Sequence, residues 1–298
     1  MTLKTAVIGL GSMGYGIAAS ILRAGHATYG YDVNPAQSAR FMAEGGAQGA
    51  LPDIAPSLDA VVVVVLNAAQ TETVLFGPQG VASLMPKGAV VIACATVPPA
   101  FARDMAARCT ALGLHYLDAP ISGGSAKAAN GKLSVMASGT PAAFAAAAPV
   151  LRATSETVFE LGNSAGAGSA MKAVNQLLAG VHIAAMAEAM TFGMTQGVSP
   201  DKFLEVISKC AGTSWMLENR APHIVAGDYT PHSSVNIWPK DLGIVLDIAR
   251  DAKFAAPITA AAMQQFLAAA GQGLGHEDDA AVAKVYARNA SLKLPGDA

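Results

Sequence analysis

Cysteine, charged and aromatic residues are scarce in this chain of 298 residues, which has three cysteines, 13% charged residues and 6% aromatic residues. Cys94, Cys109 and Cys210 have neither an even count nor the spacing of a metal-binding motif, which favours packing roles in a reducing compartment. The six histidines are scattered, without a His/Cys cluster. The sequence therefore predicts no protein-bound metal and leaves the chemistry to a cofactor.

Long apolar runs and basic stripes are also missing. The apolar run at 60–66 is far short of the roughly 20 residues that span a membrane, and the N-terminus lacks a basic segment followed by a signal-like core. The net charge is -2, and the Lys and Arg residues are scattered. These features predict a cytoplasmic protein without a nucleic-acid or membrane partner.

Apolar residues, by contrast, make up 52% of the chain, which is a globular composition on the hydrophobic side. The length suffices for two domains with separate cores. A chain rich in alanine and poor in charge fits either a large buried interface between subunits or tight packing of helices. We favour the interface, and hence a homo-oligomer, either a dimer or a tetramer.

Short β-branched runs alternate with helical stretches in the first half of the chain. Strands are expected at 3–8, 27–31, 61–65, 89–93, 115–117, 133–137 and 156–160, and helices at 12–24, 35–44, 98–111 and 141–151. This alternation is typical of the α/β class, and it predicts a Rossmann-type domain with a doubly wound parallel sheet. The run Val61–Val65 shows no polar alternation, which predicts a central strand covered on both faces.

Helices alone are expected after Gly162. A long helix without internal proline runs from 166 to 196, and further helices are expected at 200–210, 214–219, 234–252, 257–271 and 278–289. The sequence thus predicts an N-terminal NAD-binding domain of residues 1–164. It also predicts an all-α C-terminal domain of residues 165–298 for substrate binding and oligomerisation. A ligand would bind between two such domains.

A glycine-rich turn follows the first expected strand, where Gly9, Gly11 and Gly14, with Ser12 and Met13 between them, form the pattern G-x-G-x-x-G. Such a match is weak by itself because glycines also collect in turns, but here a strand precedes it and a helix follows. Gly9 would allow a tight turn, Gly11 the close approach of a pyrophosphate, and Gly14 the packing of the helix on the sheet. We therefore predict a dinucleotide site.

Asp32 closes the second expected strand. An acid at this place in a dinucleotide-binding unit accepts hydrogen bonds from the ribose hydroxyls of the adenosine. Its charge would repel a 2′-phosphate, and no arginine follows it. The sequence therefore predicts NAD rather than NADP as the cofactor.

A serine and two glycines, Ser122, Gly123 and Gly124, lie shortly after the strand expected at 115–117, in the segment D-A-P-I-S-G-G. Together they would expose consecutive backbone amides and a hydroxyl, which suits the binding of a carboxylate. The same residues also fit an ordinary tight turn, so both interpretations remain open at this point.

The long helix carries Lys172 and Asn175 three residues apart, and therefore on one face, with Gln176 beside them. Most helical lysines are solvated. Here the neighbours are Ala, Met, Val and Leu, so the polar pair must face a polar cavity or bear a large desolvation cost. Desolvation lowers the pKa of a lysine towards the range in which it exchanges a proton with a substrate hydroxyl.

Four other residues are weaker candidates for a ligand site. Lys240 lies in the segment W-P-K-D-L, which also fits the start of a surface helix with a Lys-Asp pair. Trp215, His232 and Asn236 could line a cleft. Each of the four, taken alone, is as well explained by a structural role.

With these motifs in order along essentially its whole length, the chain resembles the β-hydroxyacid dehydrogenase family, which includes 3-hydroxyisobutyrate, tartronate semialdehyde and 6-phosphogluconate dehydrogenases. The resemblance rests on the segments 9–14, 118–124, 172–176 and 240–242. It implies an enzyme that uses NAD to oxidise a small hydroxy acid.

The resemblance also implies roles for individual residues. Lys172 would be the general acid/base that takes the hydroxyl proton while the hydride passes to the nicotinamide. Asn175 would hydrogen-bond the substrate, and Ser122, Gly123 and Gly124 would hold its carboxylate. Further contacts to the cofactor would come from Leu66, Asn67, Thr96 and Lys240, the last of which would also reach the substrate.

Within the family, the segments 126–129, 135–139, 214–220 and 227–232 are similar to the enzymes that oxidise L-threonate to its 2-oxo product. L-Threonate is thus the expected substrate, with Trp215, His232 and Asn236 in the region that binds its hydroxyls. The enzymatic alternatives are 3-hydroxyisobutyrate dehydrogenase and tartronate semialdehyde reductase. A non-catalytic NAD-binding scaffold is the alternative of another class, and it would be expected to lack Lys172. Pro239 departs from the family pattern and could shift Lys240.

Overall fold

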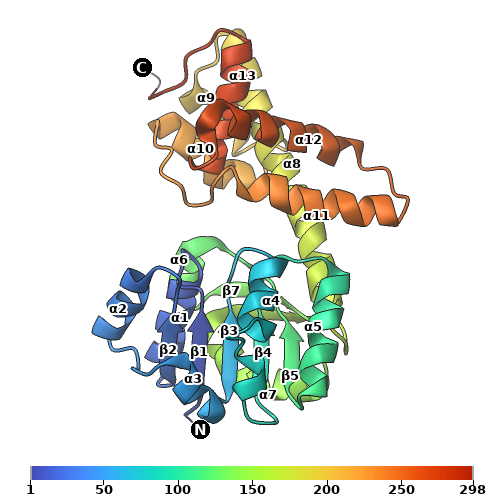
Figure 1. Cartoon of the computed structure of the whole chain (residues 1–298). Helices are drawn as coiled ribbons and strands as arrows, with labels where there is room; N and C mark the ends of the chain where they lie inside the picture. Colours follow the sequence, from blue (N-terminus) through green and yellow to red (C-terminus); the bar gives the residue numbers. More distant parts are fainter. Residues whose placement is uncertain (1, 297–298) are drawn as a thin grey trace. The chain divides into compact units, whose positions relative to one another are not determined.

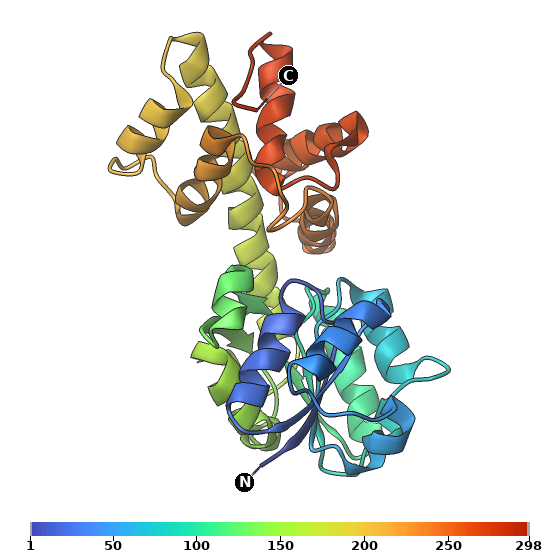
Figure 2. The same ribbon diagram turned by 90° about the vertical axis from the view of Figure 1, so that its left-hand side faces the viewer.

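The computed structural model describes residues 2–296. The chain divides into two compact units, Met1–Lys172 and Ala173–Ala298, and the long helix α8 (Ala167–Thr195) belongs to both. Figure 2 shows α8 as one continuous helix. The domain boundary expected between residues 164 and 165 lies just before α8, and it stays a prediction.

Five parallel strands form the main sheet of the N-terminal unit, in the order β2-β1-β3-β4-β5. They are β1 (Lys4–Ile8), β2 (Ala27–Tyr31), β3 (Ala60–Val63), β4 (Val90–Ala93) and β5 (His115–Asp118). Since the strand order reverses between β1 and β3, the predicted doubly wound, Rossmann-type sheet is confirmed.

Helices cover both faces of this sheet (Figure 1). They are α1 (Gly14–Arg23), α2 (Pro35–Ala43), α4 (Ala68–Phe76), α5 (Pro99–Ala111) and α7 (Pro141–Thr154), with short turns at α3 (Leu51–Ile54), η1 (Ala55–Ser57) and η2 (Ala82–Leu84). The sequence pattern missed α4 and the short turns. A nine-residue helix such as α4 covers little more than two turns, which gives a weak helical periodicity.

Alternate residues of the valine-rich strands face two separate cores. Val7 and Val62 pack on one side with Ile17 of α1. Val61 packs on the other side with Met105 of α5. Every residue of β3 is buried, as expected for a central strand, but the predicted run extends too far: Val64 and Val65 lie beyond the end of β3 and are half-buried.

Two of the predicted strands lie outside the parallel sheet. Strand β7 (Leu133–Ala137) pairs antiparallel with β6 (Ile121–Ser122) and parallel with β8 (Ser155–Glu160), in a separate sheet of three strands. The short helix α6 (Gly124–Ala129) follows β6. The sequence could not separate the two sheets because β6, with two residues, is too short to show a periodicity.

The C-terminal unit is helical, as predicted. After α8 it contains α9 (Pro200–Ile207), α10 (Trp215–Ala226), α11 (Ile237–Asp251), α12 (Pro257–Ala269), a π-helical turn η3 (Ala270–Leu274), a 3-10 turn η4 (Asp279–Val282) and α13 (Ala283–Asn289). Helix α10 extends well beyond the helix expected at 214–219. It continues through Pro222 and ends at Gly227, whose left-handed φ of 64° terminates it.

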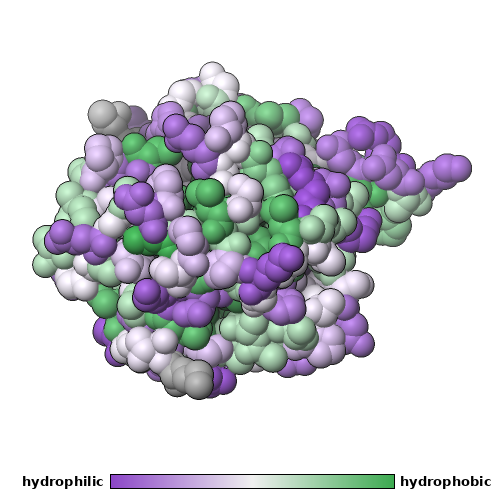
Figure 3. Space-filling view, turned by 60° about the horizontal axis from the view of Figure 1, so that its bottom comes forward, coloured by the Kyte–Doolittle hydropathy of each residue, from purple (hydrophilic) through white to green (hydrophobic). Residues whose placement is uncertain are grey.

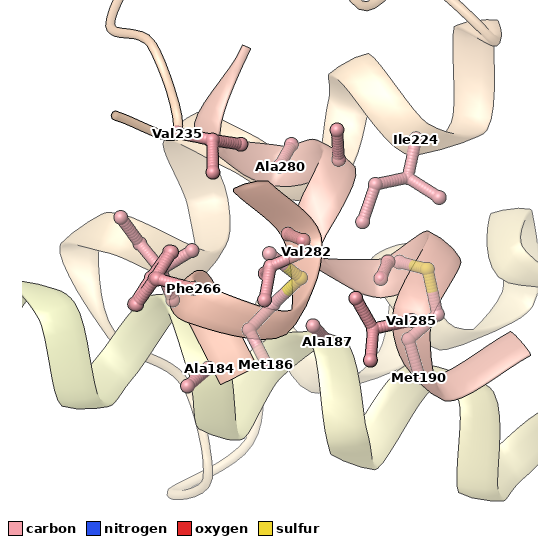
Figure 4. Packing of buried hydrophobic residues seen from close by; sticks show 14 of the residues in the cluster. Ala184, Met186, Ala187, Met190, Ile224, Val235, Phe266, Ala280, Val282 and Val285 are labelled. Atoms are coloured by element: carbon pink, nitrogen blue, oxygen red, sulfur yellow. The ribbon is translucent and has the colours of Figure 1, made fainter. Parts of the chain in front are cut away.

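The core of this unit forms around one side of α8. Met186, Ala187 and Met190 of α8 are buried with Phe266 of α12 and Val285 of α13 (Figure 4). By length and composition alone α8 could cross a membrane, but the core helix of a soluble protein meets the same test. One side of α8 packs in this core, and 39% of its most apolar 18-residue window is buried. A single helix of this kind is weak evidence for a membrane span.

Hydrophilic and hydrophobic side chains are interspersed on the face shown in Figure 3. A different distribution is found along α8, where Met171, Val174, Leu178 and Phe192 are 43% to 66% exposed. Scattered apolar residues are normal on protein surfaces, whereas a row of them along one helix marks a candidate interface.

Candidate functional site

The glycine-rich turn connects β1 to α1, and its three glycines have different environments. A Cβ at Gly9, whose φ is +98°, would collide with the carbonyl group of Val64. A Cβ at Gly14 would collide with the carbonyl group of Gly9, whereas a Cβ at Gly11 would meet nothing within 4 Å. The chain therefore needs Gly9 and Gly14 for its own packing, and it leaves space at Gly11 for a bound group to approach the backbone.

The N-terminus of α1 lacks a side-chain cap. Met13 occupies the N-cap position and makes no capping hydrogen bond. Gly11 and Ser12 are exposed, and they line a groove of about 580 Å³ together with residues of α1, α2 and α6. A pyrophosphate fits this turn because the uncapped N–H groups and the helix dipole attract negative charge.

Asp32 follows β2 and is held in place by two backbone groups. One carboxylate oxygen, Oδ2, accepts a hydrogen bond of 2.7 Å from the N–H of Leu10, and Oδ1 accepts one of 2.8 Å from the N–H of Asn34. Each oxygen has a further lone pair that suits a ribose hydroxyl. The next side chain, Val33, is fully exposed, so no cation stands beside Asp32 in the sequence.

Leu66, Asn67 and Thr96 follow β3 and β4, at the carboxyl edge of the sheet where nucleotides bind in folds of this kind. Leu66 is 62% exposed and offers an apolar surface. Asn67 is the N-cap of α4, and its side chain accepts a hydrogen bond of 2.9 Å from the N–H of Gln70. Thr96 is half-buried.

The Ser122-Gly123-Gly124 turn lies beside the buried end of Lys172. The two glycines have φ values of +132° and +77°, a region that favours glycine. Lys172 is 9% exposed, and its Nζ donates a hydrogen bond of 2.8 Å to the carbonyl oxygen of Ile121, directly before the turn. The structure thus brings together the lysine and the serine-glycine turn that the sequence singled out separately.

Asp118 holds the first turn of α8, a role that the sequence pattern did not reveal. Its buried carboxylate accepts hydrogen bonds of 2.9 Å from the N–H groups of Gly166 and Ser169 and one of 2.7 Å from the hydroxyl of Ser169. Ser138 donates a hydrogen bond of 3.2 Å to the same carboxylate and accepts one from Gly168. The available sequence signal was the position of Asp118, an acid at the end of a largely buried strand, β5.

Asn175 belongs to a row of polar side chains in the C-terminal unit. Its Nδ2 donates a hydrogen bond of 2.9 Å to Oε1 of Gln176, and Nε2 of Gln176 donates one of 2.5 Å to Oδ2 of Asp241 on α11. Lys240 forms an ion pair with Asp241, with a distance of 2.7 Å between Nζ and Oδ1. Two segments that the sequence predicted as separate site motifs therefore meet here.

Trp215, His232 and Asn236 lie on other stretches of the same unit and are all exposed. Trp215 begins α10, and Asn236 is the N-cap residue of α11. The ring of His232 packs edge-on against His223, with the ring centroids 4.8 Å apart. The part of these three residues in substrate binding stays a prediction.

The loop that carries His232 and Asn236 is fixed by two buried acids that the sequence pattern did not single out. Oδ1 of Asp278 lies 3.0 Å from Nδ1 of His223, and the carboxylate accepts a hydrogen bond of 2.9 Å from the N–H of His232. Asp279 forms an ion pair with Arg220. Burial raises the pKa of the Asp279 carboxyl, and Arg220 opposes that shift.

Pro239 lies in the first turn of α11, two residues after Ile237. The first-turn N–H groups of a helix have no partner within the helix, so a proline removes no helical hydrogen bond there. Trp238 keeps a hydrogen bond of 2.9 Å from its Nε1 to Asp279. Lys240 reaches Asp241 directly after this proline.

No group of three or more His, Cys, Asp or Glu side chains suited to a metal ion occurs in the part of the chain that the structure describes.

Two family models match the chain. Residues 4–162 match the NAD-binding domain of 6-phosphogluconate dehydrogenase. Residues 166–286 match a domain described as the NAD-binding domain of NADP-dependent 3-hydroxyisobutyrate dehydrogenase. Together these models cover nearly the whole chain, including the glycine-rich turn, Lys172 and the polar row around Asp241.

Several proteins are similar to this chain over all or nearly all of its length. L-threonate dehydrogenase of Cupriavidus necator is 50% identical over 100% of both chains. L-threonate dehydrogenase of Escherichia coli K12 is 45% identical over 97% of this chain and 96% of its own. The crystal structure of a 3-hydroxyisobutyrate dehydrogenase from Salmonella typhimurium has 48% identity and a TM-score of 0.89, covering 94% of this chain and 99% of its own.

Proposed function

Since the chain belongs to the β-hydroxyacid dehydrogenase family of NAD-dependent enzymes, we propose that it oxidises L-threonate to the 2-oxo acid, 2-oxo-tetronate, in the catabolism of sugar acids. The observation that carries this proposal is the 50% identity to an L-threonate dehydrogenase over the full length of both chains. The name of the similar Salmonella structure keeps 3-hydroxyisobutyrate as the main alternative substrate.

The proposed reaction assigns a separate task to each part of the site. Lys172 takes the proton of the reacting hydroxyl as general base, Asn175 hydrogen-bonds the substrate, and Ser122, Gly123 and Gly124 bind its carboxylate. The bond from Nζ of Lys172 to the carbonyl oxygen of Ile121 supports this arrangement, because it keeps the amine next to the turn. NAD, when bound, supplies the acceptor of the hydride.

The proposed cofactor site comprises the glycine-rich turn and the carboxyl edge of the sheet. The turn at Gly11, Ser12 and Met13 would hold the pyrophosphate, and Asp32 would hold the ribose of the adenosine. Leu66, Asn67, Thr96 and Lys240 complete the set that we assign to the cofactor. The acid at position 32 and the exposed Val33 after it support a preference for NAD over NADP.

A panel of substrates tests the proposal directly. Purified protein with NAD would be assayed at 340 nm with L-threonate, D-threonate, D-erythronate, 3-hydroxyisobutyrate and D-glycerate, and tartronate semialdehyde would be tested with NADH. We expect the highest kcat/KM for L-threonate. A higher value for 3-hydroxyisobutyrate or tartronate semialdehyde would replace the substrate and leave the family, the cofactor and the assignment of Lys172 in place.

The role of Lys172 is tested by Lys172→Ala and Lys172→Arg. We expect each variant to lower kcat by about 10²- to 10⁴-fold, because a general base is lost, while the Kd for NADH stays within about twofold of the parent value. The Kd, measured by fluorescence, is the control for folding of the N-terminal unit. Retained turnover in either variant would show that Lys172 is not the general base. If the parent protein itself turned over none of the substrates in the panel, the alternative of a non-catalytic NAD-binding scaffold would gain support.

We further propose that the protein is a cytoplasmic homo-oligomer. The three cysteines, which form no disulfide in the described residues, support a reducing compartment. The exposed apolar row on α8 supports association with a second copy, since Met171, Leu178 and Phe192 recur at multiples of seven residues.

A further inference from the structure

The row Asn175, Gln176 and Asp241 is a chain of hydrogen bonds with a fixed direction. Asp241 and Gln176 are 2% and 8% exposed, so solvent offers them few alternative partners. The donor at each step is an amide nitrogen: Nδ2 of Asn175 donates to Gln176, and Nε2 of Gln176 donates to Asp241. The chain thus runs from Asn175 on α8 towards α11.

The carboxylate of Asp241 determines this direction. An ionised carboxylate accepts hydrogen bonds and donates none, so the atom of Gln176 that faces it must be the NH2 group. The carbonyl oxygen of Gln176 then faces Asn175, which must donate a hydrogen bond to it from its own NH2 group. The opposite edge of the Asn175 amide, with its oxygen Oδ1 and the second hydrogen of Nδ2, is left in a single orientation.

We call the hydrogen-bonded chain Asn175–Gln176–Asp241 the relay. The ion pair between Lys240 and Asp241 and the packing of α8 against α11 hold this relay in place. Lys240 pairs with Oδ1 of Asp241 at 2.7 Å, which leaves Oδ2 for Gln176. Helices α8 and α11 approach closely one turn further along, because a Cβ at Gly180 would lie 2.9 Å from side-chain atoms of Trp238 and Leu242. This close approach is what brings Gln176 within reach of α11.

We propose that Asp241 and Gln176 are positioning residues that act through Asn175: the carboxylate fixes the orientation of the Gln176 amide, which in turn fixes the edge that Asn175 presents to the substrate. This inference rests on the proposed function, in which Asn175 hydrogen-bonds the hydroxy acid. The reactivity towards the substrate therefore depends on a group that touches neither substrate nor cofactor. Gln176 and Asp241 are coupled to Asn175 rather than independent of it.

A double-mutant cycle tests this coupling. Gln176→Met keeps the length of the side chain and removes both hydrogen bonds, while Lys240 keeps its partner. We expect kcat/KM for L-threonate to fall about tenfold, as for a lost hydrogen bond to a buried polar group, with the Kd for NADH unchanged. In the Asn175→Ala background the same substitution should have no further effect. Gln264→Met, an exposed position on α12, is the matched control.

A second variant, Gln176→Glu, tests the relay through the pH profile of kcat/KM, which a purely structural role of Gln176 would leave unchanged in shape. The carboxyl introduced by Gln176→Glu faces Asp241, with Lys240 on the far side of that acid, and a like charge raises the pKa of the pair. Protonated, the new carboxyl donates to Asp241 and accepts from Asn175, which restores the relay. Deprotonated, it is repelled. We expect the ratio of kcat/KM for Gln176→Glu to that of the parent to be highest at low pH and to fall as pH rises, and we expect no such change in the ratio for Gln264→Glu. A carboxylate one helical turn after Lys172 would by its charge alone raise the pKa of that amine and lower the ratio at low pH, so the sign of the change separates the relay from a direct effect on Lys172.

The outcomes separate the relay from the proposed function. If Asn175→Ala lowers kcat/KM but Gln176→Met lowers it further by the same factor in that background, the relay is overturned and the role of Asn175 stands. A Gln176→Glu profile parallel to that of the parent also overturns the relay. If Asn175→Ala leaves kcat/KM unchanged, the role of Asn175 falls, and the relay falls with it.

Discussion

The two oxygens of Asp32 serve the fold as well as the proposed cofactor site. The sequence predicted the position of this acid because a glycine-rich turn and the end of the next strand together define it. The hydrogen bonds to Leu10 and Asn34 could not be predicted, since they depend on β1 and β2 lying side by side in register. Loss of the carboxylate would therefore affect both the proposed contact with the ribose and the shape of the turn.

Changing Asp32→Ala together with Val33→Arg should move the cofactor preference towards NADP. The substitutions remove the repulsion of a 2′-phosphate and add a cation at a fully exposed position. We expect the ratio of kcat/KM for NADP to that for NAD to rise at least about tenfold, equivalent to about 1.4 kcal/mol. The affinity for NAD should also fall, because Leu10 loses its acceptor. An unchanged ratio would show that Asp32 does not face the ribose, and Val33→Arg alone is the control.

At the scale of elements, α8 shows what a pattern can and cannot predict. Its length was predicted to within one residue at each end, because the run has no internal proline and ends near a glycine. The anchor of its first turn could not be predicted, since Asp118 lies 48 residues before Gly166 in the sequence. Similarly, the partner of Gln176 depends on how α8 packs against α11, which no local pattern encodes.

The anchor of α8 predicts a large stability effect for Asp118→Asn. The carboxamide offers one acceptor oxygen to a site with several donors, so N–H groups in the first turn of α8 lose a partner. We expect the free energy of unfolding to fall by about 2 kcal/mol, measured with urea. Asp104→Asn, an acid on α5 with a 61% exposed side chain, should change it by less than about 0.5 kcal/mol. Equal effects of both substitutions would contradict the anchoring role.

For the whole molecule, the order of strand and helix patterns along the chain predicted the two kinds of unit correctly but not the number of sheets. The alternation of strands and helices followed by helices alone was enough to predict a Rossmann-type unit and a helical unit. The second sheet was missed because β6 has two residues. Neither unit buries the apolar residues exposed on α8.

The proposed association of two or more copies through α8 predicts a change in molar mass when the exposed apolar row of this helix is made polar. Leu178→Glu with Phe192→Glu places two charges on that row, where burial against a second copy would carry a high desolvation cost. We expect the molar mass from size-exclusion chromatography with light scattering to fall towards that of one chain, 30.0 kDa. Leu112→Glu, at an exposed apolar residue beside α5, is the control. The parent mass in the double variant would contradict this interface.

Because one continuous helix supplies residues to both units, the chain is a poor candidate for modular exchange. The first turn of α8 is fastened to Asp118, and later turns carry Met186 and Met190 into the other core. A hybrid made by joining the N-terminal part of one family member to the C-terminal part of another would have to match both ends of the same helix. Divergence within such enzymes is therefore expected to proceed by substitutions in place rather than by recombination of whole domains.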